Sequence, residues 1–136
     1  MRALLLALLL MLPAGAGAGA GGNPLLGTWK VVGGEPNAGP YKGEIVEFTA
    51  TEVKALPPLG CKNPRYETTR MPPEGLFQGT LPDGRQPAEA QRLGLGGAPV
   101  PGVDVTCDTG LFSYHFRTDG DLLLGLDGLI LRLHRP

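Results

Sequence analysis

The chain has few of the residues that most catalytic and metal sites require. It contains 2 cysteines and 2 histidines, and Ser113 is its one serine. His115 follows Ser113 on the same face of a predicted strand, but neither an oxyanion-forming nest nor a strained elbow surrounds that serine. A zinc site needs three or four closely spaced ligands, which this set does not offer. We therefore expect no catalytic residues, no metal and no cofactor, and we predict a protein that is not an enzyme.

An excess of charge of one sign is also absent. Lys and Arg together number 12 and Asp and Glu 13, which gives a net charge of -1. Binding to nucleic acid without sequence preference needs a strongly basic face, and a solvating acidic tail needs a run of carboxylates. The charge balance excludes both, so we expect no nucleic-acid partner.

Long apolar runs are missing except at the beginning of the chain. Arg2 supplies a positive charge, residues 3–12 form an apolar run too short to span a bilayer, and Pro13 ends it. Small residues follow, with overlapping cleavage sites after Ala18 and Ala20. We predict that residues 1–20 are a secretory signal peptide, that the protein is exported to the periplasm or the extracellular space, and that no membrane span remains after cleavage. An apolar N-terminus of a cytosolic protein is the alternative.

The two cysteines, Cys61 and Cys107, lie in the predicted mature chain. An oxidising compartment favours their pairing. The loop between them is long, so a disulfide would stabilise the fold by about 3–4 kcal/mol by restricting the unfolded chain. The alternatives are two buried free thiols, or metal ligands together with His115 and His134. We predict the disulfide.

Glycine and proline, by contrast, are abundant, with 22 and 14 residues, and they divide the mature chain into short apolar runs. Alternation of apolar and polar residues within these runs is typical of strands with one buried face. Residues 87–93 carry the helix signal, because Pro87 suits a first helical turn and Gly94 suits a helix end. The predicted strands are residues 25–32, 44–49, 51–56, 65–69, 76–81, 103–107, 112–117, 122–126 and 129–134.

Short turns in the last third of the chain favour antiparallel neighbours. Asp127 and Gly128 form a strong two-residue hairpin signal, because glycine accepts the positive φ that such turns need. In the strand before them, Phe112, Tyr114 and Phe116 share one face. The chain therefore ends in a predicted antiparallel meander with an aromatic inner face.

The opening segment Leu26-Gly27-Thr28-Trp29-Lys30 resembles the G-x-W opening of lipocalins and related calycins, which include the fatty-acid-binding proteins, and of small Inh-type protease inhibitors. The resemblance implies an all-β fold, a small antiparallel up-and-down barrel with one short helix, formed by residues 21–136 as a single domain. In such barrels the tryptophan closes one end and a basic side chain near the last strand lies across its ring. Arg132 or Arg135 suits that place, and we take Arg132 as the partner of Trp29. Residues 59–63 are also weakly similar to bacterial META domains.

The inward positions of such a barrel are the candidate lining of a ligand cavity. A small barrel can also be filled by its own side chains, so the pattern does not fix whether a cavity exists. The candidates are Val31, Val46, Phe48, Phe112, Tyr114, Phe116 and Leu131.

Together these features favour an exported, monomeric, non-enzymatic binding module. We expect its partner to be an apolar small ligand inside the barrel or an envelope protein at the rim. One alternative is a periplasmic protease inhibitor of the Inh type, in which residues 21–24 enter an enzyme cleft. The other is a structural envelope protein without a ligand.

Overall fold

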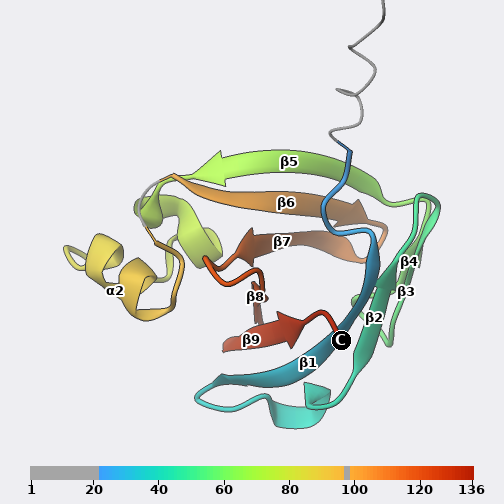
Figure 1. The fold of residues 1–136 in the computed structure, drawn as a ribbon, viewed down its shortest axis with the longest axis horizontal. Helices are drawn as coiled ribbons and strands as arrows, with labels where there is room; N and C mark the ends of the chain where they lie inside the picture. Colours follow the sequence, from blue (N-terminus) through green and yellow to red (C-terminus); the bar gives the residue numbers. More distant parts are fainter. Residues whose placement is uncertain (1–21, 97–98) are drawn as a thin grey trace, which may run out of the picture.

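The computed structural model describes residues 22–96 and 99–136, and the predicted signal peptide lies outside these ranges (Figure 1). The strands are β1 (Gly27–Glu35), β2 (Ile45–Phe48), β3 (Glu52–Lys54), β4 (Cys61–Lys62), β5 (Arg65–Met71), β6 (Val100–Cys107), β7 (Gly110–Phe116), β8 (Leu122–Leu126) and β9 (Leu129–His134). The other elements are the 3-10 segments η1 (Gly39–Tyr41) and η2 (Pro73–Gly79) and the helix α2 (Gln86–Arg92). Among the residues described, no helix is long and apolar enough to cross a membrane.

The strands form one antiparallel sheet in the order β4-β3-β2-β1-β9-β8-β7-β6-β5. Apart from β4 and β5, strands that follow one another in the chain are neighbours, and β1 also pairs with β9, with Val31 opposite Leu133. The predicted tight turns produce this order, and Asp127 and Gly128 between β8 and β9 both have positive φ. The sheet curls into a half-barrel (Figure 1). The prediction of an all-β, antiparallel, up-and-down fold with one short helix is confirmed.

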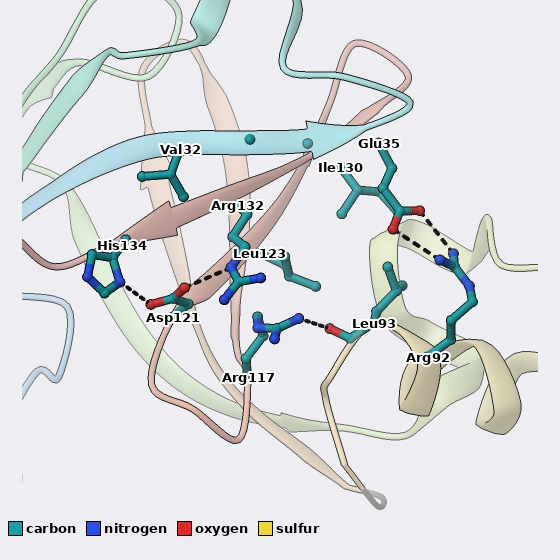
Figure 2. Close-up of a pocket in the computed structure, with 12 residues that line it drawn as sticks. Val32, Glu35, Arg92, Leu93, Arg117, Asp121, Leu123, Ile130, Arg132 and His134 are labelled. Atoms are coloured by element: carbon teal, nitrogen blue, oxygen red, sulfur yellow. Dashed lines mark hydrogen bonds and ion pairs between the residues drawn. The ribbon is translucent and has the colours of Figure 1, made fainter.

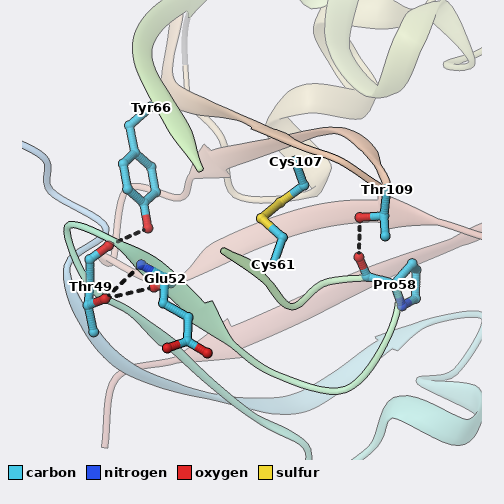
Figure 3. Close-up of a disulfide and its surroundings, with 7 residues drawn as sticks. All are labelled: Thr49, Glu52, Pro58, Cys61, Tyr66, Cys107 and Thr109. Carbon is cyan, nitrogen blue, oxygen red and sulfur yellow. Dashed lines mark hydrogen bonds between the residues drawn. A yellow bond between two sulfur atoms is a disulfide. The ribbon is translucent and has the colours of Figure 1, made fainter. Parts of the chain in front are cut away.

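The strand ladder stays open between β4 and β5, a gap that we call the seam. Cys61 of β4 and Cys107 of β6 form a disulfide across it, with their Cα atoms 5.8 Å apart (Figure 3). The hydroxyl of Tyr66 in β5 donates a hydrogen bond of 2.8 Å to the carbonyl of Thr49, which precedes β3. A covalent link and a side-chain hydrogen bond therefore join the two sides where no ladder does. The predicted disulfide is confirmed.

Apolar side chains fill the concave face of the sheet. Trp29, Phe48 and Tyr114 are each 1% exposed. The rings of Phe48 and Tyr114 meet edge to face with their centroids 5.1 Å apart, an arrangement that adds to the energy of burial. Most of the predicted cavity lining is buried in this core, where the side chains pack against one another: Val31, Val46, Phe48, Phe112, Tyr114 and Leu131.

A second apolar cluster covers part of the convex face of the sheet. Leu76 and Phe77 of η2 and Ala90 of α2 pack there against Leu123 of β8. We call residues 73–93 the cap (Figure 1). The helix predicted over residues 87–93 is confirmed as α2, and because a helix of this length is unstable alone, the burial of Ala90 holds it in place.

The strand predicted over residues 76–81 is wrong, because residues 76–79 belong to η2 and residues 80–81 form a turn. The prolines at 72 and 73 lack the N–H groups that a ladder needs. Leu76 and Phe77 are adjacent, so a strand would send them to opposite faces, whereas in η2 both are buried. Phe77 and Gln78 reach this arrangement with φ of 50° and 60°. The segment therefore folds as η2 and not as a strand, because only this conformation buries both of the adjacent apolar side chains.

Candidate functional site

Trp29 is buried in the core of the half-barrel, and its cationic partner is Arg135. The Cζ atom of Arg135 lies 4.1 Å from the centroid of the indole ring. The prediction that Arg132 lies over the ring of Trp29 is wrong. Side chains alternate along β9, and because Leu131 and Leu133 point into the core, Arg132 between them points out. Arg135 follows the end of β9, which leaves it free to fold across the ring.

The segment before β1 is held against Trp29 and Arg135. The side-chain oxygen of Asn23 accepts a hydrogen bond from the N–H of Leu25, and the Nε1 of Trp29 donates to the carbonyl of Leu25, each at 2.8 Å. Arg135 donates to the carbonyl of Pro24 at 2.9 Å. Asn23 and Pro24, which we considered as part of an inhibitory segment, are therefore tied to the barrel, and Gly21 lies outside the described residues.

A hollow of about 470 Å³ opens beside this segment, and we call it the mouth pocket. It is lined by Pro24 of the N-terminal segment and by residues of β5, β6 and β7. Its volume falls within the range of small-molecule sites. The lining consists of Pro24, Thr68, Thr69, Arg70, Pro101, Gly102 and Phe116.

The mouth pocket combines an apolar wall with one cation. Phe116 is half-buried, and its ring lies 6.5 Å from that of Trp29, centroid to centroid. Arg70 is exposed and, within the described ranges, has neither a hydrogen bond nor an ion pair to an acidic side chain. Its guanidinium is therefore free to bind a carboxylate or a similar anion, and an apolar body attached to that anion would lie on Phe116. Phe116 is the member of the predicted cavity lining that borders this pocket.

A second hollow, the outer groove, lies on the convex face between the cap and strands β1, β8 and β9, with a volume of about 460 Å³ (Figure 2). A bulge shifts the register of β1 against β9 between Val31 and Gly33, and a Cβ added at Gly33 would meet no atom within 4 Å. The backbone of β1 at Gly33 is therefore not covered by other atoms on the groove side. The apolar part of the lining consists of Val32, Leu93, Leu123 and Ile130.

Charged side chains in the outer groove are matched with charges of opposite sign. The buried carboxylate of Asp121 accepts hydrogen bonds from Arg132 and from Nδ1 of His134, both at 2.7 Å (Figure 2). Arg132 and Arg117 share Asp119, and the hydrogen bond from Arg117 is the main cause that lowers the pKa of Asp119 to about 2. These pairs neutralise one another, so the groove attracts a charged ligand less than the mouth pocket does.

The same groove fastens the cap to the sheet. Arg92 of α2 holds Glu35 of β1 through two hydrogen bonds of 3.0 Å, and this contact lowers the pKa of Glu35. Arg117 also donates to the carbonyl of Leu93 at 2.7 Å. We therefore interpret the outer groove as a structural joint and the mouth pocket as the candidate functional site.

Sequence reasoning missed Arg70, although a signal was present. Tyr66 packs edge to face against Phe48 in the core, so alternation along β5 directs Thr68 and Arg70 to the same inner side. No local sequence pattern indicated the outer groove, because the residues that line it come from four separate elements. Within the described ranges, no group of three or more His, Cys, Asp or Glu side chains is placed to hold a metal ion.

Known proteins offer no relative from which a site could be transferred: no family model, no curated protein and no solved structure matches the chain. The geometry of the mouth pocket is therefore the main basis for assigning a function.

Proposed function

We propose that the protein is an exported, non-enzymatic binding module of calycin-like architecture, and that it binds a small amphipathic anion in the mouth pocket. The observation that carries this proposal is the pairing of a free guanidinium, Arg70, with the apolar wall at Phe116 in one hollow of about 470 Å³. Export is supported by the disulfide, since paired cysteines persist in oxidising compartments.

The filled core directs the proposal to the rim of the half-barrel. Tyr114 and Phe48 occupy the centre, and a ligand there would have to displace close-packed side chains. At the mouth, by contrast, an alkyl or aryl group gains the burial of Phe116 and the two prolines without any repacking. The apolar small ligand expected from the sequence is thereby moved from the interior to the opening.

The charge at the mouth gives the ligand its class. A guanidinium binds a carboxylate with two parallel hydrogen bonds, and such charge-assisted bonds are worth about 1.5–3 kcal/mol each when formed. Because Arg70 forms no ion pair in the described part of the chain, no internal partner must be displaced first. An acid with an apolar tail satisfies both halves of the pocket.

Calorimetric titration with decanoate, and with decanol as the uncharged match, tests the proposal on protein purified from a host that exports it. Arg70→Ala should weaken decanoate binding by about tenfold or more and leave decanol binding unchanged. Phe116→Ala should weaken both ligands. Arg65→Ala is the matched control, since Arg65 is an exposed arginine on the opposite face of the same strand.

Equal binding of decanoate by the Arg70 and Arg65 variants would contradict the assignment of the anion site. Absence of any decanoate binding would contradict the proposed function. Protease inhibition by such a protein would then favour the Inh-type alternative.

A further inference from the structure

β5 is the one long strand of the sheet that lies at an edge. It pairs with β6 along its whole length, from Arg65 opposite Thr106 to Met71 opposite Val100. Its other side faces the seam, where β4 is only 2 residues long and pairs with β3 alone. Outside the β5–β6 ladder, the described residues give the β5 backbone no backbone hydrogen bond. One row of N–H and C=O groups therefore remains open.

An open edge of this kind is a template for a further strand, because alternate residues present both a donor and an acceptor in the plane of the sheet. Along β5 the residues are exposed or half-buried, and none is fully buried. The Tyr66–Thr49 hydrogen bond and the disulfide cross the seam beside the start of the strand, so the open part of the edge is residues 67–71. Thr68, Thr69 and Arg70 belong both to β5 and to the wall of the mouth pocket. A strand added at this edge would consequently deliver its inward side chains to the pocket.

We propose that the β5 edge binds an extended acidic peptide segment of a protein partner as an additional strand, with an apolar side chain of that segment in the mouth pocket. This inference rests on the proposed function and names a macromolecular form of the same ligand class. The strand carries two cations, Arg65 and Arg70, and one carboxylate, Glu67. The excess of positive charge selects acidic side chains, and the backbone supplies the affinity that is independent of sequence.

A second copy of this chain fits the edge less well. Antiparallel pairing of two β5 strands centred on Thr68 would place Arg65 opposite Met71 and Glu67 opposite Thr69, so no opposite charges would meet. Pairing centred on Glu67 would place two glutamates opposite one another, which is destabilising. The acidic peptide is therefore the occupant that the charges favour.

A peptide of alternating valine and glutamate, labelled with fluorescein, tests the proposal by fluorescence anisotropy. A set of analogues carries one N-methyl group each, moved along the backbone residue by residue. We expect methylation at every second position of the central segment to weaken binding by about tenfold or more, because those N–H groups would bond to β5. Methylation at the positions between them should change the affinity less than about twofold, since those N–H groups would face away.

Hydrogen exchange on the complex gives a second measurement. Amides of β5 that face the seam should gain protection when the peptide binds, and amides of β2, which is internal to the sheet, should not change. Arg70→Ala should reduce the affinity for the peptide, whereas replacing the glutamates of the peptide with lysines should abolish binding.

Decanoate titration of the same sample separates the two proposals. Decanoate binding without any peptide binding, or peptide binding that is insensitive to the position of the N-methyl group, would overturn the inference and leave the proposed function standing. Failure of both ligands would overturn both. A doubled mass in solution that Glu67→Lys abolishes would identify a second copy as the occupant and would also overturn the inference.

Discussion

At the residue scale, His115 is a buried imidazole between the sheet and the cap. It is 1% exposed, its ring meets that of Phe77 edge to face at 5.3 Å, and neither of its nitrogens has a hydrogen-bond partner among the described residues. Burial lowers the pKa of His115 from 6.5 to about 4, and the carboxylate of Asp104 opposes that change only in part. The folded protein therefore holds this imidazole neutral until the solution is strongly acidic.

The pKa of His115 predicts a loss of stability between about pH 6.5 and pH 4. In this window the unfolded chain binds a proton that the folded chain does not, so the free energy of unfolding falls as the pH falls, by roughly 3 kcal/mol in total. Above pH 6.5 the loss is absent, because His115 is then neutral in both the folded and the unfolded chain. Denaturant unfolding at pH 7 and pH 4.5 measures it. His115→Phe should remove most of the difference; a pH dependence in this variant equal to that of the wild-type protein would contradict the prediction.

Trp29 gives a residue-scale prediction that separates the two candidate arginines. Because Trp29 is the only tryptophan, its fluorescence reports directly on the cation above its ring. Arg135→Ala should shift the emission of the folded protein and lower the free energy of unfolding by about 1–2 kcal/mol, through the loss of the cation–π contact and two backbone hydrogen bonds. Arg132→Ala should leave the emission unchanged, although it removes a partner of the buried Asp121. An emission shift in the Arg132 variant alone would contradict this assignment.

At the element scale, the cap stores backbone strain that a substitution can relieve. Gln78 is exposed and has φ of 60°, a conformation that costs a residue with a Cβ about 1–2 kcal/mol. Gln78→Gly should therefore raise the free energy of unfolding by about 0.5–1 kcal/mol, after the greater freedom of glycine in the unfolded chain is subtracted. Gln91→Gly, at an exposed position of α2, should lower it by a similar amount. Thermal unfolding measures both; destabilisation by Gln78→Gly would show that its side chain contributes to the cap.

The elements that could be predicted from the sequence are those with a local cause. Alternation predicted the inner face of β7, where Tyr114 is buried, and the turn at Gly128 predicted the antiparallel pairing of β8 with β9. His115, on the other face of β7, could not be assigned to a buried site, because what covers it is η2, whose placement depends on distant contacts. The mouth pocket could not be predicted for the same reason. Arg70 and Phe116 line one pocket only because the strand order places β5, β6 and β7 side by side.

At the scale of the whole molecule, the seam decides whether the curled sheet keeps its shape. The ladder runs from β4 to β5 without closing, so the two ends of the sheet are joined by contacts other than strand pairing. The disulfide is one of them, and Thr109 donates a hydrogen bond of 2.7 Å to the carbonyl of Pro58 on the other side (Figure 3). The mouth pocket lies along β5, so its geometry depends on these links.

Removal of the disulfide should therefore affect stability and binding together. Cys61 and Cys107 are 46 residues apart in the chain, and a bridge closing a loop of that length stabilises a fold by about 4 kcal/mol through the entropy of the unfolded state. The double variant Cys61→Ala/Cys107→Ala should unfold at lower guanidinium concentration by a corresponding amount, and reduction of the wild-type protein should have the same effect. Hydrogen exchange should increase first in β4 and β5, the strands beside the seam, and decanoate affinity should fall because the wall formed by β5 is no longer fixed. If exchange increased uniformly over the sheet, the disulfide would restrict only the unfolded chain, and the mouth pocket would keep its affinity under conditions where the variant remains folded.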